Sequence, residues 1–324
     1  LPIFDFREIN EDIYMLIEYN TDIYNRENIE LMGAHIESIL KTVITSSKQK
    51  ISELNYLTTE ETNQLLKEFN NTRTDCLLDK TVIDLFEEQV KKTPAAIGLV
   101  YEDVSITYEK LNNQTNQLAK HIQSKTNIKR GMCVGVLIDR SELSAIYMIA
   151  IMKLGCVYVP IDKMLPAARI EYIIKESGMA LLITDEIIEA ENTGINICNA
   201  KELLSDLENY NPGNLGLTIS GKEPSFIIYT SGSTGTPKGV KQTHLTLYNR
   251  ILWDINGAKF KKQQKHLQFS SFGFDSSLHD IYYALSTGGE VHIVSDNTRK
   301  DLWQLKDYVI ERNINVLSMP YSAL

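Results

Sequence analysis

Apolar residues follow two periods that alternate from residue 80 to the end of the chain. Apolar positions three and four apart predict amphipathic helices, and short apolar runs between polar turns predict buried strands. The predicted helices lie at 81–94, 108–122, 141–155, 245–255, 276–285 and 301–313. The predicted strands lie at 132–139, 225–231, 290–296 and 314–320, with a hairpin at 97–108 around Glu102 and Asp103. Strands that alternate with helices of this length predict an α/β fold with a parallel β sheet and crossover helices.

The first 75 residues have a different organisation. Residues 1–56 predict a strand, a turn and a helix, and residues 57–75 begin with a further helix. Thr58 and Glu61, three positions apart, have the form of a capping box at the start of that helix. The polar tract NNTRTD (70–75) follows, and we predict a domain boundary there.

Composition and charge narrow the classes of function. With 324 residues the chain is long enough for about two domains, and 43% hydrophobic and 23% charged residues are typical of a globular protein. A net charge of −9 argues against nucleic acid as a partner, because phosphate backbones require a basic surface. No apolar run reaches the ~18 residues of a membrane span. The separated cysteines, without a CxxC pair, predict buried thiols in the reducing cytoplasm: Cys76, Cys133, Cys156 and Cys198.

Residues 229–240, YTSGSTGTPKGV, follow the apolar run SFIIY. Glycine, proline and hydroxyl residues exclude a helix, and we expect no ordinary strand because Pro237 lacks an N–H and the glycines have nothing to pack. A strand, a Gly-rich turn and then a helix is a general arrangement for binding phosphate. A Walker A loop is excluded, because Pro237 stands where its second glycine belongs and Gly239 where its Ser/Thr belongs. A surface loop without a ligand is the alternative.

The stretch 229–240 closely resembles the third core motif of adenylate-forming enzymes, Y-T-S-G-[ST]-T-G-x-P-K-G. This superfamily comprises acyl-CoA synthetases, luciferases and the adenylation domains of nonribosomal peptide synthetases, and its loop closes over the triphosphate of ATP. The resemblance implies that Lys238 lies near the β- and γ-phosphates. It implies a phosphate loop made of Thr230, Ser231, Gly232, Ser233, Thr234, Gly235 and Lys238.

Further motifs indicate the branch of the superfamily. ITYEKLNNQTNQLA (106–119) is similar to the first adenylation motif, with Lys110 where the family has Glu, and MKLGCVYVPID (152–162) matches the second. FDSS (274–277) matches the amino-acid-specific motif F-D-x-S. The resemblance implies that Asp275 pairs with the substrate's α-amino group and that Ser276 and His279 line the same pocket. Acyl-CoA synthetases lack that aspartate.

The resemblance extends over essentially the whole chain. It implies the C-terminal end of a condensation domain in residues 1–56, a linker in 57–79 and the N-terminal portion of an adenylation domain in 80–324. The expected fold is therefore an incomplete, acyl-CoA synthetase-like large N-terminal subdomain preceded by a condensation-domain remnant. The ribose-binding Y-x-T-G-D motif and the condensation motif H-H-x-x-x-D-G do not occur, so we expect a piece of a longer protein that is inactive alone.

The implied reaction is the activation of an amino acid by ATP and Mg²⁺ as aminoacyl-AMP, in antibiotic biosynthesis or other secondary metabolism. The acyl group then moves to phosphopantetheine on a peptidyl carrier domain, and condensation domains are the other expected partners. Neither a nucleic acid nor a membrane is expected as a partner. An acyl- or aryl-CoA ligase and a non-catalytic interaction segment are the alternatives.

Several residues have ordinary structural interpretations. We expect Lys153 to be a solvated helix end, Gly155 and Pro160 to be structural, and His244 to pack or cap. Asp275 stands just before a predicted helix, so capping competes with amino-group binding. The other histidines, His35, His121, His266 and His292, are scattered, and no carboxylate cluster marks a magnesium site.

Overall fold

The computed structural model describes residues 1–46, 48–73, 79–186, 194–231, 236–257 and 263–320. The chain divides into two compact units, Leu1–Asp75 and Cys76–Leu324. This division falls at the end of the polar tract (70–75) at which the sequence places a boundary.

The first unit is a hairpin followed by helices. Strands β1 (Ile3–Ile9) and β2 (Asp12–Glu18) pair antiparallel, and α1 (Arg26–Thr45) follows the hairpin. The predicted strand, turn and helix are confirmed, whereas β1 was not predicted. The predicted capping box is also confirmed, because the Thr58 hydroxyl accepts from the Glu61 N–H and the Glu61 carboxylate accepts from the Thr58 N–H. The remaining elements are η1 (Ile51–Glu53), α2 (Thr59–Asn63) and η2 (Gln64–Glu68).

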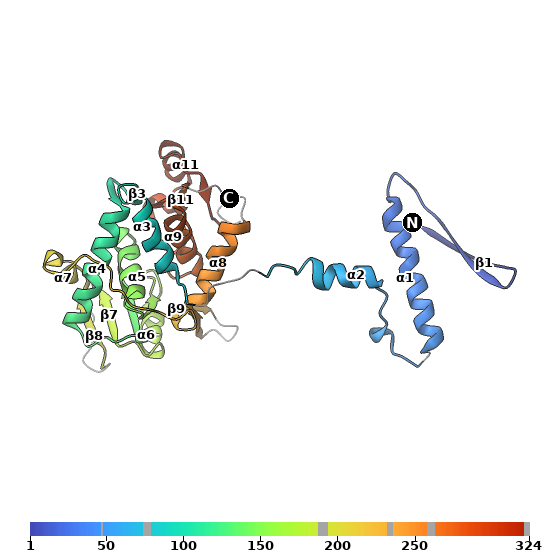
Figure 1. Ribbon diagram of the computed structural model, residues 1–324, viewed down its shortest axis with the longest axis horizontal. Coiled ribbons are helices and arrows are strands. Elements are labelled where there is room, and N and C mark those ends of the chain that lie inside the picture. The colour runs from blue at the N-terminus through green and yellow to red at the C-terminus, as the bar shows by residue number, and fades with distance from the viewer. Residues whose placement is uncertain (47, 74–78, 187–193, 232–235, 258–262, 321–324) are drawn as a thin grey trace. The chain divides into compact units, whose positions relative to one another are not determined.

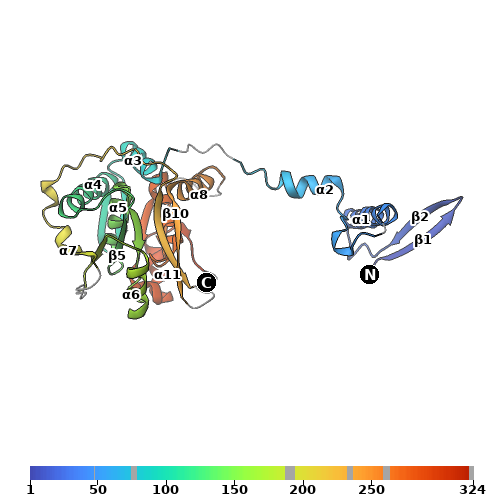
Figure 2. The ribbon, with the colours of Figure 1, turned by 90° about the horizontal axis from the view of Figure 1, so that it is seen from below.

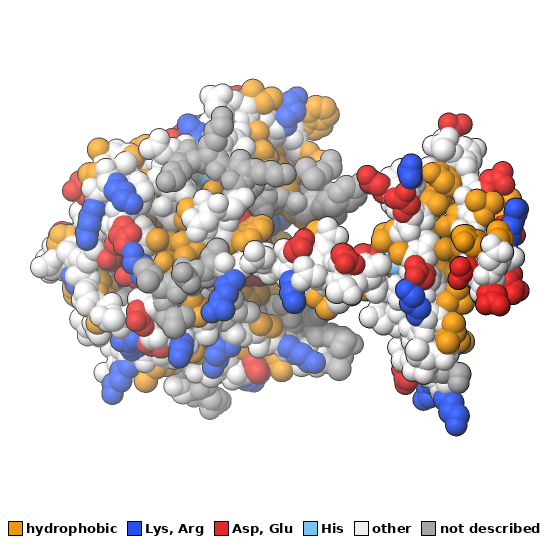
Figure 3. Space-filling model, turned by 45° about the vertical axis from the view of Figure 1, so that its right-hand side comes forward, with side chains coloured by type: hydrophobic (Ala, Val, Ile, Leu, Met, Phe, Trp, Pro, Cys, Tyr) orange, Lys and Arg blue, Asp and Glu red, His pale blue; other side chains and the backbone are white. Residues whose placement is uncertain are grey.

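This unit has little core of its own. Among its described residues Ile29 is the only fully buried apolar side chain. Figure 3 shows hydrophobic side chains gathered over the hairpin and α1 on the face in view. The exposed large apolar residues include Ile3, Phe6, Ile13, Leu16, Ile44 and Leu66.

The second unit contains two sheets (Figure 1). In spatial order, the first sheet has strands β10 (Pro237–Thr243), β9 (Pro224–Ser231), β6 (Val157–Pro160), β5 (Cys133–Leu137), β7 (Leu181–Thr184) and β8 (Asn196–Asn199). The second has β13 (Val316–Leu317), β11 (Lys265–Gln268), β12 (Glu290–Ile293), β3 (Ile97–Tyr101) and β4 (Val104–Thr107). The pairings of β9 with β10 and of β3 with β4 are antiparallel, and the others are parallel. The predicted α/β architecture is therefore confirmed.

Helices form a layer between the two sheets and cover their outer faces. A large core joins both sheets to α3 (Val82–Lys92), α4 (Tyr108–Lys125), α5 (Glu142–Lys153), α8 (His244–Gly257) and α9 (Asp275–Thr287). On the outer faces, α6 (Ala167–Glu176) packs on the first sheet and α11 (Leu302–Glu311) on the second. The short helices are α7 (Ala200–Leu203), η3 (Leu207–Asn209) and α10 (Asp296–Lys300).

Most of the predicted elements are found within one to three residues of their expected ends. The predicted strand at 314–320 shrinks to Val316–Leu317 within the described residues. Strands β7, β8 and β11 were not predicted, because runs of four residues carry little periodicity.

Candidate functional site

The Gly-rich stretch continues as a strand, which corrects the expectation that it is a loop leading directly to a helix. Strand β10, labelled in Figure 2, begins at Pro237 and pairs antiparallel with β9. Lys238 lies opposite Thr230 and Gly239 opposite Tyr229. Helix α8 follows only after this strand. Gly232, Ser233, Thr234 and Gly235, together with the side chain of Ser231, lie outside what the structure describes.

Position in the sheet explains why this strand tolerates its residues. Within the described part of the chain, β10 is the edge of its sheet and Pro237 is its first residue, where the missing N–H costs no interior ladder bond. The sequence also argued against a strand because its glycines would have nothing to pack, and this is wrong at Gly239. A Cβ there would lie 3.0 Å from Cζ of Tyr229, because the tyrosine ring crosses that position.

Two of the predicted phosphate-binding residues can be placed. Thr230 and Lys238 are both exposed and lie side by side across the two strands. A hydroxyl and an ammonium at this place can both donate to an anion.

A pocket of about 420 Å³ opens where α8 and α9 begin, beside the end of the β9–β10 hairpin that is far from its turn. It brings together the three predicted substrate residues, Asp275, Ser276 and His279, from α9. Phe226 and Gln242 of the hairpin, which are register partners, and Arg250 of α8 line it as well. Lys238 and Thr230 are not among its lining residues.

Strand β10 connects this pocket to the phosphate-loop position. Gln242 is four residues from Lys238 on the same strand, and four residues of strand span about 13 Å at ~3.3 Å each. A ligand that reached from Asp275 along β10 would therefore have Lys238 at its far end.

Asp275 is not a helix cap, which corrects its expected position. Helix α9 begins at Asp275 itself, and Phe274 occupies the N-cap position without a side-chain hydrogen bond. The exposed Asp275 carboxylate makes no hydrogen bond within the described residues. An acidic group in the first helical turn is still favoured by the helix dipole.

His279 lies in a network of charges beneath the pocket. Its Nε2 lies 2.6 Å from Oδ2 of Asp254, and its Nδ1 lies 3.6 Å from Oδ1 of Asp280. Burial alone would lower the pKa of His279, but hydrogen bonds and charges of Asp280 and Asp254 outweigh it and raise the pKa. Asp254 and Arg250 had no signal in the sequence, because their importance depends on α8 packing against α9.

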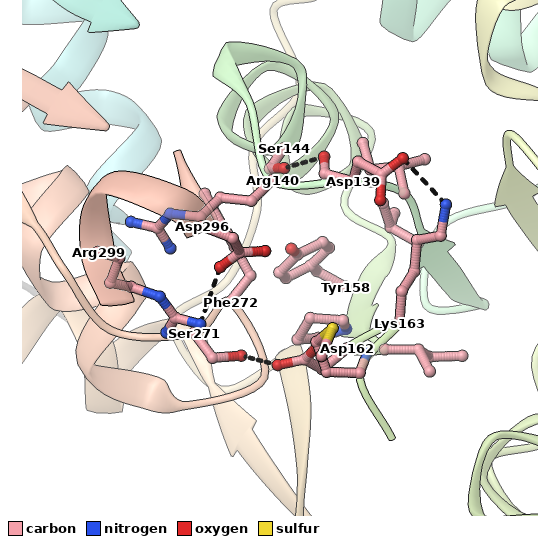
Figure 4. Close-up of a pocket in the computed structure, with 15 residues that line it drawn as sticks. Asp139, Arg140, Ser144, Tyr158, Asp162, Lys163, Ser271, Phe272, Asp296 and Arg299 are labelled. Carbon is pink, nitrogen blue, oxygen red and sulfur yellow. Dashed lines mark hydrogen bonds and ion pairs between the residues drawn. The ribbon is translucent and has the colours of Figure 1, made fainter. Parts of the chain in front are cut away.

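A second, smaller pocket of about 60 Å³ lies at the carboxyl ends of β5 and β6, facing the ends of β11 and β12 (Figure 4). Arg140 lies here and donates from Nε to the Val294 carbonyl at 2.6 Å, from Nη1 to the Ser270 carbonyl at 2.8 Å, and from Nη2 to Gln268. Burial, followed by the charge of Arg299, lowers the pKa of Arg140 to about 10. The volume of this pocket is much smaller than that of the pocket at Asp275. The hydrogen bonds of Arg140 here connect the two sheets, and we assign the residues around it to that structural role.

Lys153 is buried, which corrects the expectation of a solvated helix end. Its side chain is 1% exposed, and its ammonium donates to Glu87 at 3.0 Å, Asn112 at 2.6 Å and Asn116 at 2.5 Å. Burial lowers the pKa of Lys153 to about 8, although Glu87 acts in the opposite direction. These partners serve packing between helices and do not line the large pocket.

His244, as expected, packs. It is the first residue of α8, is fully buried, and neither ring nitrogen has a hydrogen-bond partner within the described residues. Burial lowers its pKa to about 4. Gly155 adopts a φ of +67° and its carbonyl accepts from Gly131, and Pro160 ends β6, so their structural roles are confirmed.

Metal ligands and membrane-spanning helices are both absent from the described residues. No three or more His, Cys, Asp or Glu side chains there are grouped as metal ligands. Among the same residues, no helix combines the length and apolar character needed to cross a bilayer.

Sequence comparison matches residues 86–324 to the family described as AMP-binding enzyme. Bacitracin synthase 3 from Bacillus licheniformis is 35% identical over 315 residues, which are 96% of this chain and 5% of that protein. Gramicidin S synthase 2 from Brevibacillus brevis is 32% identical over 310 residues, or 95% of this chain and 7% of that protein. The chain thus spans only a small part of the length of these relatives.

Solved structures are similar as well. The N-terminal subdomain of Klebsiella oxytoca NpsA, in complex with 3-hydroxyanthranilyl-AMSN, has a TM-score of 0.66 at 28% identity, covering 74% of this chain and 59% of that chain. FmoA3, described as a nonribosomal peptide synthetase, has a TM-score of 0.78 at 18% identity, covering 97% of this chain and 33% of that chain. At that identity the second likeness concerns the fold alone.

Proposed function

This chain belongs to the AMP-binding enzyme family, and on that premise we propose that it is part of a nonribosomal peptide synthetase that activates an amino acid with ATP. Its second unit has the fold of an adenylate-forming N-terminal subdomain, as the motifs predict. The relatives are peptide-antibiotic synthases by name, and this supports the wider assignment.

One observation carries the amino-acid assignment. Asp275 presents a carboxylate without a protein hydrogen-bond partner in the described residues, at the edge of a pocket large enough for an amino acid. A carboxylate in that position suits an ammonium group, because a hydrogen bond to a charged group is stronger than one between neutral groups. Arg250 and His279 in the same pocket would contact the rest of the substrate.

The proposed reaction follows from the arrangement along β10. The substrate carboxylate attacks the α-phosphate of ATP, and aminoacyl-AMP and pyrophosphate result. Thr230 and Lys238, at the other end of β10 from the pocket, would donate to the phosphates, where negative charge must be stabilised during the transfer. With these residues we propose Ser231, Gly232, Ser233, Thr234 and Gly235 as the phosphate loop.

ATP is usually bound together with Mg²⁺, which neutralises negative charge on the phosphates. The described residues offer no cluster of side chains for it. We therefore assign none of the described residues to the metal. Phosphopantetheine on a carrier domain would receive the acyl group outside this chain.

The domain organisation is part of the proposal. Residues 1–56 would be the end of a condensation domain, 57–79 a linker, and 80–324 the first part of the adenylation domain. The sparse core of the first unit supports this, because a hairpin and helix with such exposed apolar faces need further chain to cover them. The described cysteines, Cys133, Cys156 and Cys198, are free thiols, which supports a cytoplasmic location.

Aryl-acid activation is the second candidate. A structural relative, NpsA, is named in complex with 3-hydroxybenzoyl-AMSN, an aryl compound. Asp275 distinguishes the two candidates, because a benzoate has no ammonium group to pair with it.

Pyrophosphate exchange tests the proposal. The parent protein, or its complete adenylation domain, is assayed for exchange between ATP and labelled pyrophosphate with each proteinogenic amino acid, ornithine, and benzoate and anthranilate derivatives. We expect exchange with one or a few amino acids and none with benzoates. Exchange with benzoates alone would establish the aryl-acid candidate, and no exchange with any acid would favour a non-catalytic segment.

A further inference from the structure

Asp254 and His279 connect two helices beneath the large pocket. Asp254 is on α8 and His279 on α9, and the distance from Oδ2 to Nε2 is 2.6 Å. The Asp254 side chain is 4% exposed and the His279 side chain 22% exposed, so only the histidine reaches the pocket. Arg250, one turn earlier on α8, places its Nε 3.4 Å from the same carboxylate oxygen.

Carboxylates lie near both ring nitrogens of His279. Nε2 is hydrogen-bonded to Asp254, whereas Nδ1 lies 3.6 Å from Oδ1 of Asp280, an ion-pair distance and not a hydrogen bond. Tyr283 stacks on the ring from α9, at a centroid distance of 6.1 Å, and the charge of His279 acts on His266 of β11. With a carboxylate at each nitrogen, the protonated ring is the form that this site favours.

We propose that Asp254 is a positioning residue for amino-acid recognition, which fixes the ring of His279 in one orientation and keeps its Nε2 proton away from the substrate. This inference rests on the proposed function of the pocket. It gives His279 a definite role: the ring presents a fixed shape and charge to the substrate, while its Nε2 is held by Asp254. The fixed ring would then select the substrate side chain by shape and charge.

Loss of Asp254 should therefore affect amino-acid binding and leave the ATP side intact. Asp254→Asn keeps an oxygen acceptor for Nε2 and removes the charge, whereas Asp254→Leu removes both. In the complete adenylation domain we expect KM for the preferred amino acid to rise about tenfold or more in Asp254→Leu, and less in Asp254→Asn. We expect kcat and KM for ATP to stay within about twofold of the wild type.

Dependence on pH separates positioning from simple packing. Burial acts against it, but Asp280 and Asp254 raise the pKa of His279, so in the wild type KM for the amino acid should begin to rise only above the ordinary pH range of histidine. In Asp254→Asn only Asp280 remains opposite the ring, so the same rise in KM should begin at a lower pH than in the wild type. Asp275 and Arg250, the other charged groups of the pocket, are present in both proteins, although Arg250 loses its ion pair with Asp254 in the variant.

A double-mutant cycle tests whether Asp254 acts through His279. In a His279→Gln background, Asp254→Asn should change KM no further, because the residue that it positions is gone. Glu290→Gln is the matched control, because Glu290 lies 3.0 Å from His292 in another histidine–carboxylate pair that does not line this pocket. The control should leave KM for the amino acid unchanged.

One measurement needs no variant and covers the case in which Asp254→Asn does not fold. A pH titration followed by nitrogen NMR shifts of labelled histidine in the wild-type domain should place the midpoint of His279 above the ordinary histidine value of about 6.5. A midpoint at or below that value, or unchanged KM and pH profile in a folded Asp254→Asn protein, would overturn the inference. Absence of amino-acid-dependent exchange in the wild type would instead overturn the proposed function.

Discussion

The ammonium of Lys153 lies 3.0 Å from the carboxylate of Glu87, in a site where the lysine side chain is 1% exposed. Glu87 is on α3, and the other acceptors, Asn112 and Asn116, are on α4. The last residue of α5 therefore holds three helices of the central layer together. A buried charge with all its donors satisfied stabilises a fold only while every partner remains.

Replacement of Lys153 by methionine should destabilise the protein strongly. Removing the lysine leaves the amide oxygens of Asn112 and Asn116 without a donor and the Glu87 charge with only the amide of Asn214, and the expected loss is about 3–5 kcal/mol in the free energy of unfolding. Urea unfolding of the complete domain measures it. Lys175→Met is the control, because Lys175 also lies in the last turn of a helix but is exposed, and we expect a change within about 0.5 kcal/mol.

Lys238→Ala should lower the rate of adenylation without unfolding the protein. Lys238 is exposed on the edge strand, so the melting temperature should hardly change, while exchange should fall at least about tenfold, or ~1.4 kcal/mol. Lys241→Ala, also exposed on β10, is the matched control and should behave as the wild type. Normal exchange in Lys238→Ala would remove the lysine from the proposed phosphate site.

Replacement by alanine should lower stability at one aspartate, Asp301, and amino-acid affinity at another, Asp275, although both lie at the start of a helix. Asp301 caps α11 by accepting from the N–H groups of Trp303 and Gln304, so Asp301→Ala should cost about 1 kcal/mol of stability and leave KM unchanged. Asp275 caps nothing, so Asp275→Ala and Asp275→Asn should retain stability but raise KM for the amino acid about tenfold. A normal KM in Asp275→Asn would return the acyl-ligase interpretation to consideration.

His244 should make the protein sensitive to acid. Burial lowers its pKa from 6.5 to about 4, so the unfolded chain binds a proton between these values and the folded protein does not. Its contribution is complete above about pH 6.5 and is lost as the pH falls to 4, with a limiting slope of ~1.4 kcal/mol per pH unit. Comparing the unfolding free energies of the wild type and His244→Leu over this range should give a shallower acid slope in the variant. Equal slopes would mean that the ring is protonated in the folded state.

Local pattern predicted the large elements, and tertiary packing decided the rest. The helix face Leu278, Ile281, Tyr282 and Leu285 is predicted by its spacing and is fully buried in the structure. Strand β10 was missed because its composition is unsuited to an interior strand and acceptable only at an edge, which a sequence does not reveal.

In the candidate site, too, local sequence pattern predicted some residues and tertiary packing decided the others. Asp275, Ser276 and His279 follow from one short motif and share a pocket. Asp254, 25 residues before His279, is ordinary by its sequence context and becomes a partner only because α8 packs against α9. Lys153 was misjudged for the same reason, because its partners come from other helices.

The hydrogen bonds of Arg140 affect how the second unit unfolds locally. Its guanidinium, just beyond β5, holds carbonyl oxygens at the ends of both β11 and β12, so neither end is released while the sheets stay together. In hydrogen-exchange terms, fraying from this edge is suppressed, and amide protons of β11 and β12 should exchange at the slow rate of strands in the first sheet. The two sheets then form one cooperative unit of unfolding, even though each has its own outer core.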